Sequence, residues 1–178
     1  VSNQDELDLV KQSKSKNTVK HANTWVAFGA NQYKGQIKSN RPHGKGEYRW
    51  KNGDRYQGQF NLGLMHGSGL WHQRNGDTYE GQFVDDLPHG NGIFTFKDGS
   101  VYEGYFKKGF IDSEGFLKSK NGFILSGKFT STDDKYWKLN GTIKHRSGLK
   151  WCSGDFSFTR SNKPSGYLSS HKTLLSTP

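Results

Sequence analysis

Histidines are the residues of this sequence best suited to metal binding or acid–base chemistry, and the chain has seven of them. Three, His43, His66 and His89, each precede a glycine and lie 23 residues apart. Repeated spacing gives each histidine the same local surroundings. If two strands separate successive histidines, they lie about 10 Å apart, which is too far to share one zinc ion at Zn–N distances of about 2.1 Å. We therefore expect each imidazole to hydrogen-bond a loop carbonyl and cap a turn. Metal ligation and a pH-sensitive contact are the alternatives.

Carboxylate pairs and the single cysteine are the remaining candidates for catalysis. Asp85-Asp86 and Asp133-Asp134 are adjacent acids; paired acids hydrolyse glycosides across a cleft, but the sequence builds no cleft and favours solvated loop charge. Cys152 has no motif typical of a reactive thiol, and one cysteine excludes a disulfide scaffold and a Cys-rich zinc site. The recurring Gly-x-Gly pairs precede strand-like segments, so they form no phosphate-binding loop. We expect no catalytic residue, no metal site and no cofactor, and we expect that the chain is not an enzyme.

A 23-residue repeat determines where these side chains lie. Tyr33, Tyr56, Tyr79 and Tyr102 follow one another at this spacing, and Leu125 takes the next place. Most of the 23 glycines also fall at fixed places in the repeat. Hydrophobic residues make up only 30% of the chain while aromatic residues reach 14%, so a single thick core is excluded and a thin structure of tight turns is favoured.

Each repeat is interpreted as two short strands. The Tyr-x-Gly-x-Phe start alternates with period two, which is typical of a strand, and the aromatic segment after Gly-x-Gly predicts a second strand. Asn52-Gly53 and its counterparts in later repeats are the strongest signals for two-residue hairpin turns, and the other connection, residues 61–67, is expected to be a longer loop. Glycine in a strand lets a neighbouring aromatic ring lie over the backbone. The sequence therefore predicts an all-β fold, an elongated, twisted, single-layer antiparallel sheet of stacked 23-residue β-hairpins with short flanking caps.

The pattern Tyr-x-Gly-x-Phe, His-Gly-x-Gly and Asn/Asp-Gly at this period resembles the MORN repeat (membrane occupation and recognition nexus). The resemblance extends from Tyr33 to Phe156; the fourth unit departs from it at Asp112-Ser113, and the fifth departs at Leu125 and by an insertion. It implies a role in binding or assembly, with any catalysis in other domains. Relatives include junctional membrane proteins, plant phosphatidylinositol phosphate kinases, lysine methyltransferases, cytoskeletal scaffolds and alsin-type exchange factors, and the final units are similar to the end of the alsin array.

Three segments follow from the repeat. Residues 1–32 form an N-terminal flank, with a short helix near residues 3–10, a linker and a capping strand at residues 25–28. Residues 33–157 form the repeat array. Its units begin at residues 33, 56, 79, 102 and 125, with a partial unit from residue 151, and residues 154–160 are the candidate for the second cap. Residues 158–178 form a C-terminal tail.

Aromatic side chains are the first candidates for partner binding, because a single sheet has no layer that covers its faces. One alternation set of the second strands comprises Tyr48, Trp50, Trp71, Phe94 and Phe96. Part of this set must pack within the sheet, and any remainder forms an apolar groove suited to a helix or an extended segment of a protein partner. Packing alone and self-association are the alternatives.

Positive charge gives the second candidate surface. The net charge is +10, and residues 102–154 hold ten Lys or Arg and five Asp or Glu. Lys107, Lys108, Lys118, Lys120 and Lys128 are the candidates for contact with anionic lipid or an acidic partner, at about 1 kcal/mol per lysine near an acidic membrane; the alternative is a solvated face. Nucleic acid is not favoured, since basic residues alternate with acids and no nucleic-acid-binding motif is present.

These features predict a non-enzymatic scaffold that binds a protein partner through the aromatic groove. The alternatives are peripheral attachment to anionic membranes through the later repeats, and an accessory array of an alsin-like exchange factor for Rab GTPases. We expect a cytoplasmic location, at a membrane or at the cytoskeleton.

Overall fold

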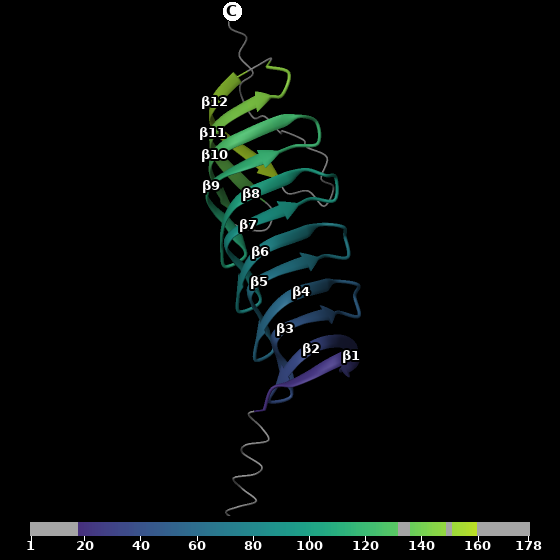
Figure 1. Ribbon diagram of the computed structural model, residues 1–178. Coiled ribbons are helices and arrows are strands. Elements are labelled where there is room, and N and C mark those ends of the chain that lie inside the picture. Colours follow the sequence, from purple (N-terminus) through teal and green to yellow (C-terminus); the bar gives the residue numbers. More distant parts are fainter. Residues whose placement is uncertain (1–17, 132–135, 149–150, 160–178) are drawn as a thin grey trace, which may run out of the picture. The chain divides into compact units, whose positions relative to one another are not determined.

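Twelve strands build the part of the protein that the computed structural model describes, residues 18–131, 136–148 and 151–159. These residues contain no helix, and their strands form one antiparallel sheet whose strand order is the chain order (Figure 1). The strands are β1 Lys20–Phe28, β2 Asn31–Lys38, β3 Arg41–Arg49, β4 Arg55–Asn61, β5 Leu64–His72, β6 Thr78–Val84, β7 Leu87–Thr95, β8 Val101–Lys107, β9 Phe110–Lys118, β10 Phe123–Ser131, β11 Tyr136–His145 and β12 Trp151–Thr159. The predicted all-β fold of stacked hairpins is confirmed.

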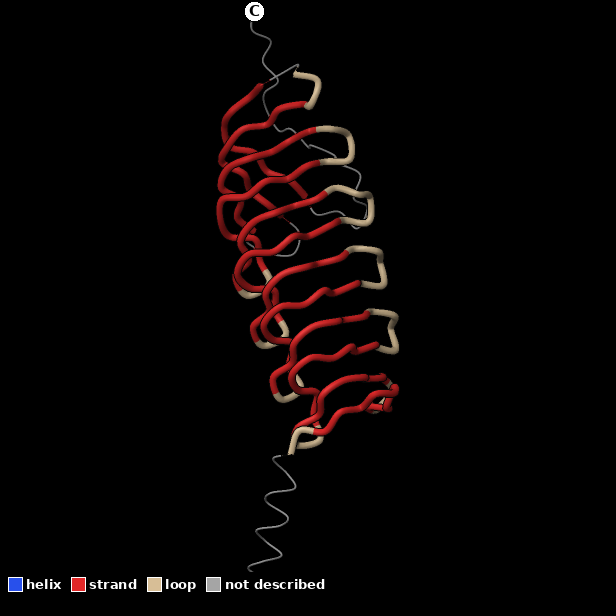
Figure 2. The backbone as a smooth tube through the Cα atoms, in the orientation of Figure 1, coloured by secondary structure: helices blue, strands red, loops and turns tan. Residues whose placement is uncertain are grey.

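The described residues divide into two compact units. The first comprises the described residues up to Arg74 together with Phe83–Asp86, and the second comprises Asn75–Gln82 and the described residues from Leu87 onward. In the first unit β1 to β5 pair in succession, and in the second β7 to β12 do the same. Figure 2 shows loops only between the ends of successive strands, so each connection within a unit closes a hairpin.

Buried tyrosines form the centre of each repeat. Tyr33, Tyr56, Tyr79 and Tyr102 are completely buried. Each ring lies over a glycine of the adjoining strand, and a Cβ added to Gly46 would collide with the Tyr33 ring. The predicted packing of aromatic rings over glycine is therefore present, and it explains why these strand positions lack side chains.

Phenylalanine rings join the tyrosines in an edge-to-face row within each unit. In the first unit the Tyr56 ring lies 5.0 Å from both Phe60 and Phe83, at angles of 84° and 83°. In the second, the Tyr102 ring lies 5.5 Å from Phe106 and 5.2 Å from Phe129. This geometry stabilises aromatic pairs beyond the effect of burial. A row of rings thus replaces the thick core that the composition excludes.

The two kinds of hairpin connection are the reverse of those predicted. A two-residue turn at Leu62-Gly63 joins β4 to β5, with φ of 48° and 101°, and Lys108-Gly109 joins β8 to β9, with φ of 51° and 84°. Positive φ at both central residues is the type I′ pattern expected for Asn-Gly. The segment 61–67, predicted to be a longer loop, is this turn followed by the start of β5.

The Asn-Gly pairs lie in longer loops instead. Asn52 and Gly53 belong to the loop between β3 and β4, in which Gly53 alone has a positive φ. Asn52 Oδ1 accepts the amide N–H of Asp54 at 2.9 Å, and the Gly53 amide donates to the Trp50 carbonyl at 3.0 Å. Asparagine therefore closes an Asx turn and does not occupy a type I′ position. The dipeptide alone does not distinguish these two uses.

Several predicted segments lie outside the described residues. These are the helix near residues 3–10, the linker that follows it, the acids Asp133 and Asp134, and the tail from residue 160 onward. Among the described residues, β1 includes residues 25–28, for which a capping strand was predicted. β1 stands at one end of the strand order and β12 at the other.

Candidate functional site

A groove of about 430 Å³ opens in the first unit. Its lining is mainly apolar and includes Phe28, Pro42, Tyr48, Trp50, Met65 and Trp71. Asn52, Asp54 and Asp86 add polar atoms. The volume falls within the usual range of small binding sites, so the groove has room for a few side chains of an occupant.

Cross-strand pairing places the three predicted aromatic residues together. Tyr48 on β3 and Trp71 on β5 each pair with Tyr56 on the intervening strand β4. Opposed residues of antiparallel strands direct their side chains to one face, so Tyr48 and Trp71 flank the buried Tyr56 ring. Trp50 follows β3 and its ring lies 4.7 Å from that of Tyr48. Tyr48, Trp50 and Trp71 are all half-buried.

Two aspartates give the groove a negative border. Asp86 Oδ1 accepts the amide N–H of Met65 at 2.7 Å, and the Asp86 amide donates to the Met65 carbonyl at 3.0 Å. Asp54 Oδ1 accepts the amide N–H of Arg74 at 2.7 Å. Because both acids are fixed by main-chain bonds, their charge remains beside the apolar lining.

The indole of Trp71 carries a buried donor. Its Nε1 has no hydrogen-bond acceptor among the described residues. Buried donors in native proteins are almost always paired, so this N–H is an exception among the described residues. Because solvent does not reach it, it lies behind the surface of the groove.

Phe94 and Phe96 belong to the second unit and do not line this groove. Phe94 on β7 is buried, and its ring lies 4.8 Å from that of Phe96. The Phe96 ring lies 5.5 Å from Trp137 on β11. The predicted five-residue set therefore consists of a trio in the first unit and a pair in the second. The sequence reasoning missed Trp137 because the insertion near residues 133–136 hides its place in the repeat.

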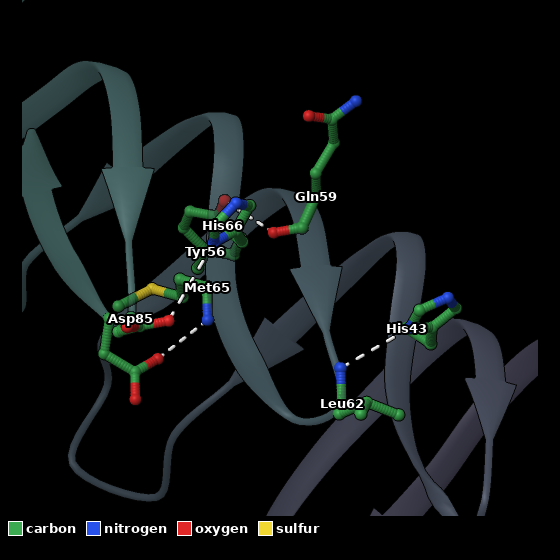
Figure 3. A network of polar contacts seen from close by, with 8 residues as sticks. His43, Tyr56, Gln59, Leu62, Met65, His66 and Asp85 are labelled. Atoms are coloured by element: carbon green, nitrogen blue, oxygen red, sulfur yellow. Dashed lines mark hydrogen bonds and ion pairs between the residues drawn. The ribbon is translucent and has the colours of Figure 1, made fainter. Parts of the chain in front are cut away.

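The repeated histidines lie on strands and not in loops, which corrects the prediction. β3, β5 and β7 begin two residues before His43, His66 and His89. His43 Nδ1 accepts the amide N–H of Leu62 at 3.4 Å, and His66 Nδ1 lies 4.0 Å from Asp85 Oδ1 (Figure 3). The predicted carbonyl partner is therefore wrong for His43, whose partner is an N–H in the turn of the next repeat. Across the described ranges, no three His, Cys, Asp or Glu side chains are grouped so that they could hold a metal ion.

The five candidate lysines are exposed but occupy three places in the second unit. Lys107 and Lys108 stand at the turn before β9, and Lys118 and Lys120 stand at its other end. Lys128 lies within β10, opposite Glu114. The ends of a nine-residue strand such as β9 are about 25 Å apart, so one compact ligand does not contact all five.

A further set of basic residues escaped the sequence reasoning. The loops that follow β3, β5, β7, β9 and β11 each carry a Lys or Arg at the same place. We call these residues the loop-edge cations: Lys51, Arg74, Lys97, Lys120 and Arg146. Only Lys120 was among the predicted lysines. The signal was present, because the first four follow the same 23-residue spacing as the tyrosines.

Comparison with protein families agrees with this architecture. The sequence model of the MORN repeat matches residues 33–55, 56–78, 79–101 and 102–123, which together make up just over half of the chain. The chain belongs to the MORN-repeat family. A search of curated proteins finds no match.

Membership of the MORN-repeat family indicates a repeat module, of a kind that often binds membranes or proteins and is generally not catalytic. The four matched MORN repeats end at residue 123, but β10, β11 and β12 continue the same hairpin pairing beyond that point. No helix among the described residues is long and apolar enough to cross a membrane.

Proposed function

We propose that this MORN-repeat chain is a binding module that holds a segment of a protein partner in the groove of its first unit. The observation that carries the proposal is the gathering of the half-buried Tyr48, Trp50 and Trp71 around one groove. Aromatic side chains bury large areas at small entropic cost and dominate the energetics of many interfaces.

The polar atoms of the groove define the chemistry of the occupant. Asp54 and Asp86 border the apolar lining, so a segment with a Lys or Arg beside its apolar side chains is favoured over an acidic one.

Selection from a display library of short peptides tests this proposal. Peptides selected on the full chain are expected to combine aromatic or aliphatic residues with Lys or Arg. The double substitution Trp50→Ala and Trp71→Ala is expected to lower the affinity for the selected peptides by about tenfold or more, since central aromatic residues are typical hot spots. Fluorescence anisotropy of labelled peptide measures the affinity.

The control is Phe116→Ala. Phe116 lies on β9 of the second unit and is 55% exposed, so its truncation removes a comparable ring without touching the groove. Circular dichroism confirms that each variant retains the sheet. Equal affinity of the groove variant and the unchanged chain would contradict the proposal, and so would an equal loss in the Phe116→Ala variant.

Peripheral attachment to anionic membranes is a second candidate, supported by the turn between β8 and β9. There Lys107 pairs with Phe110, which is 40% exposed, and Lys108 adjoins them. Leu87, in the same unit, is 46% exposed. Exposed apolar side chains beside lysines suit a bilayer surface, because the apolar groups enter the interface while the lysines contact anionic head groups.

Vesicle sedimentation tests the second candidate. The chain is expected to sediment with phosphatidylcholine vesicles only after phosphatidylserine is added, and Lys107→Gln with Lys108→Gln is expected to reduce the bound fraction. Lys34→Gln with Lys45→Gln is the matched control, because both residues are exposed and lie on strands of the first unit. Absence of any preference for anionic vesicles at low salt would remove this candidate.

A further inference from the structure

The loop-edge cations differ from ordinary surface lysines in how their main chain is held. In the second unit, the amide N–H of Lys97 donates to Asp77 Oδ1 at 2.8 Å, and that of Lys120 donates to Ser100 Oγ at 3.1 Å. The amide of Arg146 donates to the Gly122 carbonyl at 2.9 Å. Each acceptor belongs to the preceding repeat, 20 or more residues earlier. Successive repeats therefore fix the Cα position of each cation.

The same arrangement recurs independently in the first unit. There the amide of Lys51 donates to Asn31 Oδ1 at 3.0 Å, and that of Arg74 donates to Asp54 Oδ1 at 2.7 Å. Five basic residues thus occupy one position of the repeat, and the amide N–H of each donates to the preceding repeat or, for Lys51, to the N-terminal flank.

Glycine in the preceding loop makes room for the stems of Arg74, Lys97 and Arg146, whereas nothing lies within 4 Å of a Cβ added to Gly99, in the loop before Lys120. A Cβ added to Gly76 would lie 3.2 Å from Lys97 Cβ, and one added to Gly122 would lie 3.0 Å from Arg146 Cδ. In the first unit Arg74 lies over Gly53 in the same way. Because these three stems pack on the loop, less conformational freedom is lost when their charged heads bind a ligand.

The nearby carboxylates keep their own negative charge but form no ion pair with these cations. Asp77 is buried, and its Oδ1 accepts the Lys97 amide N–H; Asp98 Oδ1 accepts the amide N–H of Ser100 at 2.8 Å. The ion pairs found among the described residues, Arg49 with Glu47 and His66 with Asp85, include none of the loop-edge cations. All five are exposed. Their charges are therefore available to a partner.

Spacing identifies the kind of partner. The loops after β7, β9 and β11 are separated by two strands each, so Lys97, Lys120 and Arg146 follow one another at steps of about 10 Å. A peptide in the extended polyproline II conformation rises about 3.1 Å per residue with three residues per turn, so every third side chain recurs on one face at about the same interval. The two residues that follow each of these cations are polar or lack a side chain, but Phe123, which follows the loop of Lys120, is 37% exposed. Vesicle binding therefore has to separate a protein segment from a bilayer.

We propose that Lys97, Lys120 and Arg146 form a binding site for an extended acidic segment of a protein, with a carboxylate at about every third residue. The site lies in the second unit and is separate from the aromatic groove, so it goes beyond the function proposed above. The carboxylates pair with three pre-positioned cations, and the intervening residues of the segment cross the loops between them.

Two fluorescein-labelled peptides of equal composition test the spacing. One repeats the triplet Glu-Ser-Thr, and the other gathers all its glutamates in one block. Anisotropy on the full chain at low salt is expected to show binding of the triplet peptide at least about fivefold tighter than the block peptide, and added salt is expected to weaken both because the charges are exposed. Equal affinity for the two peptides would overturn the proposed spacing.

Charge-matched variants test the residues. Substitution of Lys97, Lys120 and Arg146 by Gln is expected to lower the affinity for the triplet peptide at least about fivefold, because three individually weak ion pairs are lost together. The control changes Lys34, Lys45 and Lys138 to Gln, which removes the same charge from exposed strand positions, and is expected to remain within about twofold of the unchanged chain. An equal loss in both variants would show that net charge alone attracts the peptide and would overturn the site.

Vesicles provide the last discrimination. The proposal fails, and the edge contacts lipid, if two results occur together. The loop-edge variant no longer sediments with phosphatidylserine vesicles, and the triplet peptide binds neither the variants nor the unchanged chain. Retained vesicle binding together with lost peptide binding supports the proposal. Circular dichroism of each variant shows that the sheet is intact, as expected for substitutions at exposed side chains.

Discussion

At the scale of single residues, the repeated tyrosines are chemically identical but not equally satisfied. The hydroxyl of Tyr56 donates to the Gln59 carbonyl at 3.0 Å, whereas the buried hydroxyl of Tyr102 has no partner among the described residues. The fourth repeat carries Tyr105 where the second carries Gln59. Gln59 Oε1 accepts the amide N–H of Ser68 at 3.1 Å, a contact that the tyrosine does not reproduce.

This difference predicts opposite effects of the same substitution. Tyr56→Phe is expected to lower the free energy of unfolding by about 1 kcal/mol, because a buried hydrogen bond is lost. Tyr102→Phe is expected to leave it unchanged or to raise it, because an unpaired buried hydroxyl is removed. Urea denaturation followed by circular dichroism measures both, and each variant serves as the control for the other. Similar destabilisation of the two variants would contradict the explanation.

At the scale of elements, the turns show where the sequence is informative and where it is not. Period-two alternation located the strands because one face is buried, as the rows of Tyr and Phe confirm. It did not locate the two-residue turns, because Leu62 and Lys108 adopt positive φ although their side chains disfavour it. Pairing of the flanking strands, and the bond from the Gly63 amide to the Pro42 carbonyl at 2.7 Å, impose that conformation.

The candidate site was also predictable only in part from the sequence. Alternation placed Tyr48 and Trp71 on one face, and their shared pairing with Tyr56 brings them together. Alternation did not separate them from Phe94 and Phe96, because division into compact units depends on contacts that a repeat does not encode. The loop-edge cations were recoverable from spacing alone, but the main-chain bonds that hold them, such as Lys97 to Asp77, appear only in three dimensions.

Turn strain gives a prediction at the element scale. Leu62 has φ of 48° and is 44% exposed. Leu62→Asn is expected to raise the free energy of unfolding by about 0.5–1 kcal/mol, because Asn tolerates left-handed φ and creates an Asn-Gly turn. Leu64→Asn is the control: Leu64 is 41% exposed but lies on β5, where Asn disfavours the strand. A loss of stability in the Leu62 variant would show that its side chain makes contacts that outweigh the strain.

At the scale of the whole molecule, stability is distributed over equivalent tyrosines, and this makes it sensitive to alkaline pH. Burial raises the pKa of Tyr33 to about 12 and raises the pKa values of Tyr56, Tyr79 and Tyr102 still further. In the unfolded chain these phenols ionise near pH 10. Above that pH the unfolded state releases protons that the folded state retains, so the free energy of unfolding falls as pH rises. Below pH 10 both states are protonated and these groups cause no change.

Each tyrosine is expected to contribute a loss of up to about 1.4 kcal/mol per pH unit between its unfolded and folded pKa; for Tyr33 that window closes at about pH 12. Urea denaturation between pH 8 and pH 11.5 measures the slope, and absorbance of tyrosinate shows that ionisation accompanies unfolding. The double variant Tyr56→Phe and Tyr79→Phe removes two of the four phenols and is expected to halve the slope, although it is less stable at neutral pH. An unchanged slope would mean that alkaline unfolding begins elsewhere in the chain and that the buried tyrosines do not control it.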